Sequence, residues 1–238
     1  PIALAVIVLG GFFGYRYFSS SSKQIESIAV MPFVNETGDA GIEYLADGMT
    51  ETLIRNLSQL PNLNVKARAS VFRYKGRETD PKTIGKELGV QAVLIGRFVP
   101  REGEVLHLGL ELIDTQTENV VWTNDYDRKP SEIIVLQNAI ARDVSSKLRP
   151  TRSGSDQPKA SKSYTENAEA YRLYLQGRYF WNKRSVPSFK DAIKCFEQAL
   201  ALDPNYALAY SGLADSYALL TVYRGGDPRD IMPKAKDA

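Results

Sequence analysis

The sequence has little of the chemistry that metal centres and nucleophilic enzymes use, because its 238 residues include one cysteine and one histidine. Cys195 and His107 exclude a disulfide within the chain, a zinc site built from the usual ligand sets, and a two-histidine metal centre, and we expect no Cys-His dyad. The chain also lacks a phosphate-binding loop, a dinucleotide fingerprint, a serine-nucleophile elbow and kinase signatures. We therefore predict that this chain is not an enzyme and holds no catalytic, cofactor-binding or metal-ligating residue.

Charge of one sign is not in excess, and no dense basic block occurs. The 30 Lys and Arg residues oppose 28 Asp and Glu residues, which gives a net charge of +2. Proteins that bind nucleic acid carry clustered cations that neutralise phosphates. Nucleic acid is therefore not an expected partner. The 43% of hydrophobic residues are typical of a globular protein, and the length fits one or two domains.

The longest apolar run stands at the start of the chain. Residues 1–15 carry no charge, and aromatic residues follow beside Arg16 in the manner of an interfacial belt. Eighteen helical residues span about 27 Å, slightly less than the hydrocarbon core of a bilayer. We expect a truncated transmembrane helix over 1–18. A signal peptide is the alternative, but a basic first region and an immediate cleavage site are missing.

Several expectations about membrane topology accompany this segment. Gly10 and Gly14 have the GxxxG spacing that lets two such helices approach, which predicts a homodimer contact, although glycine-rich packing against lipid explains the same spacing. Residues 19–25 are a polar linker. We expect a single-pass anchor in the inner (plasma) membrane with residues 19–238 outside the cytoplasm.

Residues 26–149 alternate between strand and helix patterns, which predicts an α/β domain with a mixed sheet. Buried strands are indicated by continuous apolar runs, and helices by apolar residues that recur every three or four positions. The expected strands are 27–34, 64–72, 90–99, 106–112 and 120–126, and the expected helices are 45–57, 81–88 and one that follows an N-cap at Ser131. His107 falls on the face of its strand that points to water.

A small basic and aromatic patch surrounds a turn at Gly76. It consists of Arg68, Phe72, Arg73, Tyr74, Lys75 and Arg77. Such a patch fits an acidic partner or a glycan, and a solvated strand end is the alternative.

Three segments of the α/β region match one family pattern, and they read IAVMPFVNETGD, EYLADGMTETLIRNLSQLPNLNV and IGKELGVQAVLIGRF. They resemble the TolB-like amino-terminal domain, which is related to FlgO and CsgG-type periplasmic folds. Such domains often stand just outside a transmembrane helix and before tetratricopeptide repeats, in bacterial proteins whose cytoplasmic half is a Ser/Thr kinase, a nucleotide cyclase or a winged-helix regulator. The resemblance implies assembly or signal recognition outside the cytoplasm and supplies no catalytic residue.

A linker is predicted over 150–163, which is rich in Ser, Pro and charge. Small and large residues then recur over 164–238 at Ala192, Phe196, Ala199 and Pro204, and at Tyr210, Leu213, Ala214 and Tyr217. This spacing is similar to tetratricopeptide repeats, which are all-α hairpins, with a second repeat that is incomplete at residue 238. A loop from Ser185 to Pro187 is expected to lengthen the first repeat.

In tetratricopeptide repeats, ligands lie against the concave face that the first helix of each hairpin lines. By position in the repeat, the candidate protein-binding residues are Tyr171, Tyr174, Arg178, Trp181, Leu208, Ser211 and Asp215. Ordinary packing between helices is the alternative for several of these side chains.

Two functions follow from this organisation. The first is the non-catalytic protein-binding sensor or scaffold region of a membrane-anchored bacterial signalling protein, whose parent is a candidate Ser/Thr protein kinase. The second is a structural protein of envelope assembly or secretion. The identity of the protein or peptide partner is not indicated by the sequence.

Overall fold

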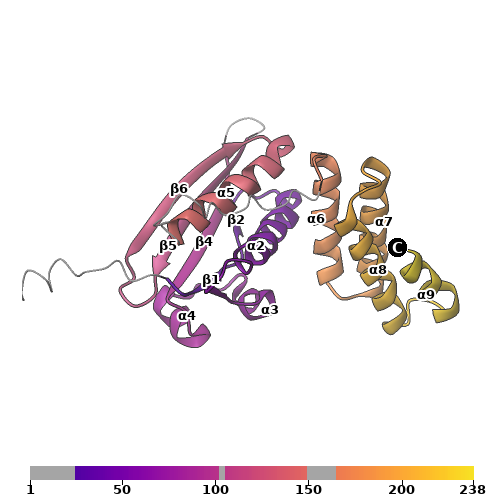
Figure 1. The fold of residues 1–238 in the computed structure, drawn as a ribbon, viewed down its shortest axis with the longest axis horizontal. Coiled ribbons are helices and arrows are strands. Elements are labelled where there is room, and N and C mark those ends of the chain that lie inside the picture. Colours follow the sequence, from indigo (N-terminus) through magenta and orange to yellow (C-terminus); the bar gives the residue numbers. More distant parts are fainter. Residues whose placement is uncertain (1–24, 102–104, 149–164) are drawn as a thin grey trace, which may run out of the picture.

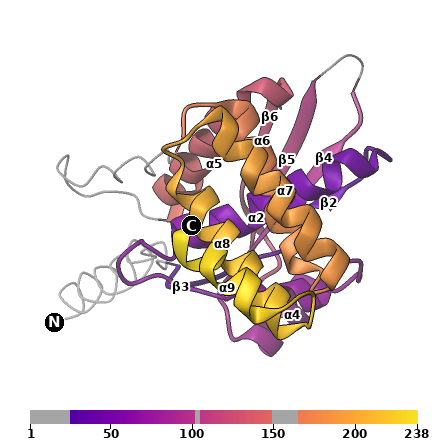
Figure 2. The same cartoon turned by 90° about the vertical axis from the view of Figure 1, so that its right-hand side faces the viewer.

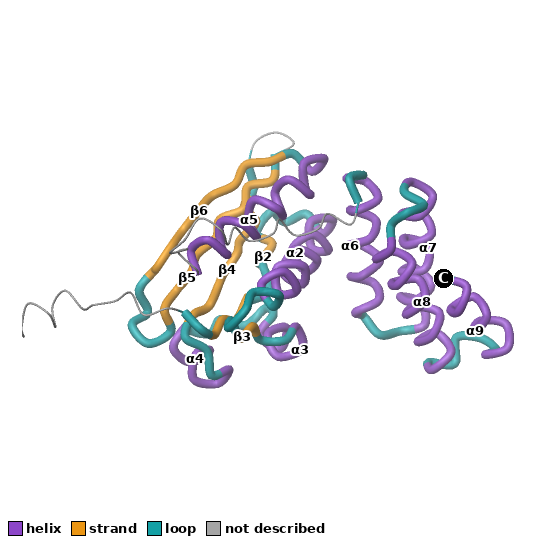
Figure 3. The backbone as a smooth tube through the Cα atoms, in the orientation of Figure 1, coloured by secondary structure: helices purple, strands orange, loops and turns teal. Residues whose placement is uncertain are grey.

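The computed structural model describes residues 25–101, 105–148 and 165–238. The first two stretches form a sheet domain, and the third forms a set of helices beside it (Figure 1, Figure 3). The strands are β1 (Ser27–Val30), β2 (Val34–Asn35), β3 (Asn64–Val65), β4 (Ala92–Val99), β5 (Leu106–Asp114) and β6 (Val120–Arg128). The helices and 3-10 turns of the sheet domain are η1 (Ala40–Ile42), α2 (Glu43–Leu57), α3 (Arg68–Val71), η2 (Phe72–Tyr74), α4 (Pro81–Leu88), η3 (Pro130–Glu132) and α5 (Ile133–Leu148). The helical part comprises α6 (Ala168–Asn182), α7 (Val186–Leu202), α8 (Ala207–Val222) and α9 (Pro228–Asp237).

The strands form one mixed sheet in the order β3-β1-β4-β5-β6, and β2 also pairs with β4. The pairs β1 with β3, β1 with β4 and β2 with β4 are parallel. The pairs β4 with β5 and β5 with β6 are antiparallel. The prediction of a mixed-sheet α/β domain followed by helical hairpins is confirmed.

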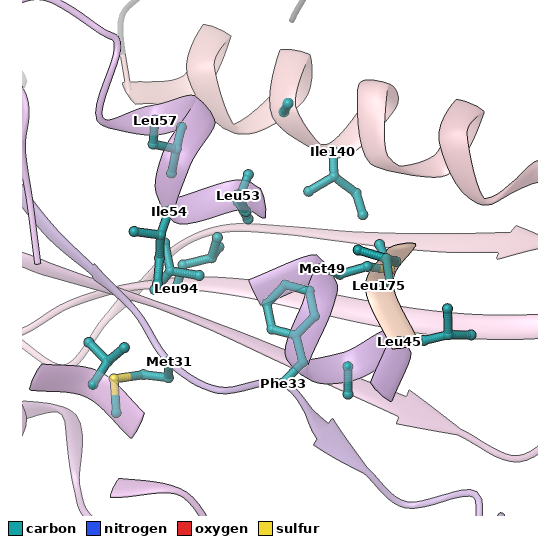
Figure 4. Close-up of a cluster of buried hydrophobic side chains, with 14 of the residues drawn as sticks. Met31, Phe33, Leu45, Met49, Leu53, Ile54, Leu57, Leu94, Ile140 and Leu175 are labelled. Atoms are coloured by element: carbon teal, nitrogen blue, oxygen red, sulfur yellow. The ribbon is translucent and has the colours of Figure 1, made fainter. Parts of the chain in front are cut away.

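One face of the sheet carries the core of this domain. Leu106, Leu108, Leu110 and Leu112 of β5 are buried, while the residues that alternate with them are half-buried. Helices α2 and α5 lie side by side over this face (Figure 1). Figure 4 shows side chains of α2, α5 and β4 in one cluster. Each fully buried leucine contributes roughly 1.5–3 kcal/mol, so this face holds α2 firmly in place.

Residues 64–72 do not form one strand, so that prediction is wrong. Strand β3 ends at Val65, and α3 and η2 follow. Val71 and Tyr74 are 0% and 6% exposed. They are three residues apart, so one helical turn places both side chains in the core, which a strand would not do. The Tyr74 hydroxyl also donates to Glu87 of α4. Tertiary burial therefore overrides the local alternation that favours a strand.

Two helix starts differ from the predictions as well. Ser131 is not an N-cap, because it lies inside η3, where the Lys129 backbone N–H donates to Glu132 Oε2 at 3.1 Å. Ser185 does not open an inserted loop, because it caps α7 by accepting from the Ser188 backbone N–H at 3.3 Å. Pro187 lies in the first turn of α7, where its missing N–H leaves no hydrogen bond unmade.

The helical hairpins pack through glycines that face one large ring. Helices α6, α7, α8 and α9 contact one another in succession (Figure 2). Phe196 of α7 is fully buried, and a Cβ atom on Gly177 of α6 or on Gly212 of α8 would lie 2.6 Å from its ring. The two glycines therefore let α6 and α8 approach α7 closely.

Within the described part of the chain, no helix is long and apolar enough to cross a membrane. The predicted transmembrane segment 1–18, with Gly10 and Gly14, lies outside the described residues. The predicted domain boundaries around the linkers 19–25 and 150–163 stay predictions.

Candidate functional site

The seven side chains predicted to bind a partner divide between two helices. Tyr171, Tyr174, Arg178 and Trp181 belong to α6, and Leu208, Ser211 and Asp215 belong to α8. Helix α6 contacts α2 of the sheet domain. We call this contact the α2–α6 joint. The structure thus places the α6 set at or beside the joint and leaves the α8 set on another surface.

Tyr171 and Tyr174 are only 5% and 4% exposed. The ring centroid of Tyr174 lies 5.2 Å from that of Tyr206 and 6.0 Å from that of Phe196. Arg55 of α2 donates from Nη1 to the Tyr174 hydroxyl at 3.5 Å. Burial raises the pKa of Tyr171 above its usual value, so its hydroxyl stays neutral. Both tyrosines pack between helices, and neither lines an open groove in this structure.

Glu51 of α2 is the centre of an ion-pair network across the joint. Arg178 Nη2 lies 2.5 Å from Glu51 Oε1, and Asn182 Nδ2 donates to Glu51 Oε2 at 3.2 Å. Arg68 Nε lies 3.3 Å from Glu51 Oε2. The side chains of Arg178, Glu51 and Arg68 are 18%, 19% and 26% exposed. Partial burial reduces solvent screening, so these pairs hold α6 against α2 more strongly than surface pairs would.

An apolar contact completes the joint. A Cβ atom on Gly48 of α2 would lie 2.8 Å from Leu175 Cδ2, so glycine permits an approach that a larger residue would prevent. Figure 4 shows Leu175 of α6 beside Met49 of α2, in the same cluster as Leu45. Helix α2 therefore packs directly against α6.

An arginine cluster lies at the carboxyl end of α6. The guanidinium carbons of Arg178 and Arg184 lie 4.5 Å and 3.6 Å from the ring centroid of Trp181. Arg68 of α3 belongs to the same cluster. Burial lowers the pKa of the Arg68 guanidinium, the charges of Arg178 and Arg184 act in the same direction, and Glu51 opposes them. Arg68 and Arg178 both pair with the carboxylate of Glu51, while Arg184 makes no ion pair with a described residue, and the cluster therefore has excess positive charge.

The basic and aromatic patch predicted around Gly76 adjoins this cluster. Lys75 Nζ lies 2.5 Å from Asp47 Oδ1 and 2.6 Å from Glu43 Oε1, both on α2. Burial raises the pKa of Asp47, and Lys75 opposes that rise. The Arg68 guanidinium lies 3.6 Å from the Phe72 ring centroid. The patch is therefore built on α3 and η2 beside the joint and is not a strand end.

The α8 set has a different environment. Leu208 is half-buried, and Ser211 and Asp215 are exposed. Their spacing of three and four residues places them on one face of the helix. Tyr210, which is 37% exposed, lies next to them along α8. This face is accessible to a separate molecule in the structure.

The one histidine and the one cysteine are both at least partly buried in the fold. His107 is half-buried rather than a plain surface histidine, and its Nδ1 lies 2.7 Å from Asp127 Oδ1 across the β5–β6 pair. Cys195 lies buried in α7, and burial raises the pKa of its thiol to about 11, so it remains a thiol near neutral pH.

Sequence reasoning missed Gly48, Glu51, Asn182 and Arg184. Gly48 carried a usable signal, because a glycine inside a helical pattern is unfavourable unless something approaches closely. Glu51 carried none, since its partner Arg178 is 127 residues away along the chain.

Comparison with protein-family models gives two matches. Residues 23–143 match the HilA/YgeH-like transcriptional regulator, second domain. That stretch is 121 of the 238 residues, or about half of the chain. Residues 188–220, which span most of α7 and most of α8, match the TPR repeat. The prediction of tetratricopeptide repeats is confirmed there.

Comparison with curated proteins and solved structures gives further relatives. A protein of Rhizobium meliloti (strain 1021) named "Putative adenylate cyclase 3" is 33% identical over 188 residues, and the match covers 79% of this chain and 32% of that protein. The chain therefore spans about a third of the length of that relative. Lipoprotein GNA1162 from Neisseria meningitidis is 19% identical with a TM-score of 0.39, over 52% of this chain and 99% of that one. TolB from Acinetobacter baumannii is 12% identical with a TM-score of 0.38, over 54% of this chain and 29% of that one.

Proposed function

This chain belongs to the family of the HilA/YgeH-like transcriptional regulator second domain, and on that premise we propose that it is the non-catalytic, protein-binding region of a larger bacterial regulatory protein. The tetratricopeptide repeat is the binding element, since stacked helical hairpins present extended surfaces to other proteins. The observation that carries the proposal is the contrast between α6, which is joined to α2, and α8, whose Ser211 and Asp215 are exposed.

In this proposal the regulatory output of the parent protein comes from outside the chain. The Rhizobium meliloti relative, which bears the name of a cyclase, extends well beyond the matched region. A nucleotide cyclase, a Ser/Thr protein kinase or a DNA-binding domain would each serve as the output. The relationship of the sheet domain to TolB-like domains belongs to the same proposal, and the segment IAVMPFVNETGD supports it.

The membrane topology is also part of the proposal. The uncharged run 1–15 supports a single-pass anchor over 1–18 in the inner membrane, with residues 19–238 outside the cytoplasm. Gly10 and Gly14 support a homodimer contact between two anchors. The effect of a partner that binds at α8 would then be transmitted to the output domain through the helical part, the sheet domain and the anchor.

The test is site-specific photo-crosslinking of the full-length parent protein in its host. A photoreactive amino acid replaces Ser211 on α8, and a control carries it at Thr123, which is exposed on β6. We expect one discrete adduct with another protein from position 211 and none from position 123. The additional change Asp215→Lys should abolish the adduct, because it reverses the charge beside the photoreactive group.

Two outcomes would contradict the proposal. Adducts of the chain with itself from position 123 alone would favour the alternative of an envelope-assembly protein. Formation of cyclic AMP or transfer of phosphate from ATP by the purified 238-residue chain would show that it is an enzyme.

A further inference from the structure

The arginine cluster at the end of α6 has buried hydrogen-bond donors without acceptors. Arg68 Nε and Trp181 Nε1 are both buried, and neither has a hydrogen-bond partner in the described part of the chain. Arg68 Nε lies within ion-pair distance of Glu51 but is not aligned for a hydrogen bond. A buried donor without an acceptor is unfavourable, so the hydrogen bonding of this cluster is not completed within the described part of the chain.

Arg184 has an unusual backbone conformation for its residue type. It follows α6 with a φ of 52°, in the left-handed region that glycine adopts most readily at the end of a helix. An L-residue with a side chain adopts this conformation at an energetic cost. The Arg184 guanidinium nevertheless lies 3.6 Å from the Trp181 ring centroid, and it makes no ion pair with any described residue. The exposed Arg184 guanidinium is therefore stacked on an aromatic ring and available to a separate molecule.

The charge of this surface defines its ligand. The guanidiniums of Arg68 and Arg178 already pair with the carboxylate of Glu51, so this setting accommodates a carboxylate, and the exposed guanidinium of Arg184 has no such partner among the described residues. Guanidiniums pair with carboxylates through two parallel hydrogen bonds, and stacking on an aromatic ring fixes the guanidinium plane. The surface is therefore suited to further carboxylates.

The long stretches of this chain outside the described residues do not supply such a ligand. Residues 1–24 contain two cations, Arg16 and Lys23, and no acidic residue. Residues 149–164 contain four cations and one acidic residue, Asp156. Both stretches are basic, so neither of them supplies an acidic segment for this surface.

We propose that the surface formed by Arg68, Arg178, Trp181 and Arg184 binds an acidic polypeptide segment of a partner protein. Carboxylates of the partner pair with the exposed guanidinium of Arg184 and with the exposed parts of the Arg68 and Arg178 side chains. The surface takes residues from both α3 and α6, so it exists only when the α2–α6 joint is intact. The surface is separate from the α8 face. The experiments on the two surfaces can therefore succeed or fail independently of each other.

The test is fluorescence anisotropy with a labelled oligoglutamate peptide and the purified 238-residue chain. The change Arg184→Gly removes the guanidinium and suits the left-handed backbone. We expect roughly tenfold weaker binding, the loss of one charge-assisted hydrogen-bonded pair. The thermal midpoint should stay unchanged or rise, because glycine relieves the backbone strain. A merely structural role of Arg184 would lower that midpoint.

The chain offers a matched control in Arg224. It follows α8 with a φ of 58°, and it is exposed. The change Arg224→Gly removes the same charge and relieves the same strain at the equivalent place in the next hairpin. We expect it to leave oligoglutamate binding unchanged. An equal loss of binding in Arg184→Gly and Arg224→Gly would show that only the net charge of the chain matters, and it would overturn the proposal.

Two further probes decide the chemical class of the ligand. An oligoglutamine peptide of equal length should not bind, because its amides do not pair with guanidiniums as carboxylates do. Tripolyphosphate should bind more weakly than oligoglutamate. Tighter binding of tripolyphosphate, or no saturable binding of oligoglutamate at low ionic strength, would overturn the proposal of an acidic polypeptide.

Discussion

Helices α6 and α8 hold the same position in successive hairpins, but one joins two domains and the other is accessible. Helix α6 carries Tyr171 and Tyr174, which are buried, while α8 carries Ser211 and Asp215, which are exposed. The difference comes from the sheet domain, since α2 contacts α6. A residue's place in a repeat therefore does not tell whether it binds a separate partner, because the neighbouring domain decides which surfaces remain accessible.

The same comparison separates two kinds of polar surface. At the joint, charged side chains such as Glu51 and Arg178 are less than one fifth exposed and pair within the chain. On α8, Asp215 is exposed to solvent. Partly buried pairs fix geometry, whereas solvated charges contribute little stability and remain available for steering a partner. Four substitutions test this contrast.

The largest effect is expected from Phe196→Ala, which affects α6 and α8 together. The Phe196 ring is fully buried against Gly177 and Gly212. Its loss leaves a cavity between three helices, and we expect a destabilisation of about 3–5 kcal/mol. Urea unfolding measures it. Leu202→Ala, at a position 46% exposed on the same helix, is the control and should cost far less. A small effect of Phe196→Ala would mean that the hairpins do not pack around this ring.

The next effect is expected from Gly48→Val, which separates α6 from α2. A side chain at this position would overlap Leu175, so we expect a cost of about 1–3 kcal/mol. Hydrogen exchange should show lower protection along α6 and little change along β5. Gly109→Val is the control, because a Cβ atom there meets only Asp125 Oδ1 at 3.2 Å. Equal loss of protection in both variants would contradict a role of Gly48 in the joint.

The sequence alone predicts a helix or strand correctly where the burial of its side chains depends on that element and its immediate neighbours. Alternating leucines identify β5, and α4 begins after Asp80, which accepts from the Thr83 backbone N–H, and ends before Gly89 with a φ of 61°. The sequence alone does not predict the secondary structure correctly where contacts with distant parts of the chain determine it. Residues 64–72 follow a strand pattern, but Val71 and Tyr74 reach the core through a helical turn.

The candidate site was predictable only in part, for the same reason. Position in the repeat identified residues on the first helices of both hairpins. It could not show that Arg178 pairs with Glu51, because no local pattern links side chains so far apart in the chain. The basic patch at Arg68 was visible in the sequence, but its continuation into Arg184 depends on how α6 lies against the sheet domain.

A smaller effect is expected at the start of α6. Asn167 caps this helix by accepting from the backbone N–H groups of Glu169 and Ala170, both at 3.0 Å. Helix α8 follows Tyr206, which makes no such side-chain cap. We expect Asn167→Ala to cost about 1 kcal/mol. Asn167→Asp keeps the capping oxygen and should restore stability in thermal unfolding. Failure of that variant to restore it would show that the cap is not the source of the loss.

The smallest effect, with the opposite sign, is expected from Tyr206→Phe at the start of α8. The Tyr206 hydroxyl is buried, and no described residue is its hydrogen-bond partner. Burial raises its pKa above the usual value, so the group stays neutral near neutral pH. Because the hydroxyl is desolvated without compensation, its removal should increase stability by less than about 1 kcal/mol. The matched control is Tyr126→Phe, which removes a hydroxyl that donates to Asp143 Oδ2 at 2.8 Å and should lower stability by about 1 kcal/mol. A loss of stability in Tyr206→Phe as large as in Tyr126→Phe would contradict an unpaired hydroxyl at the start of α8.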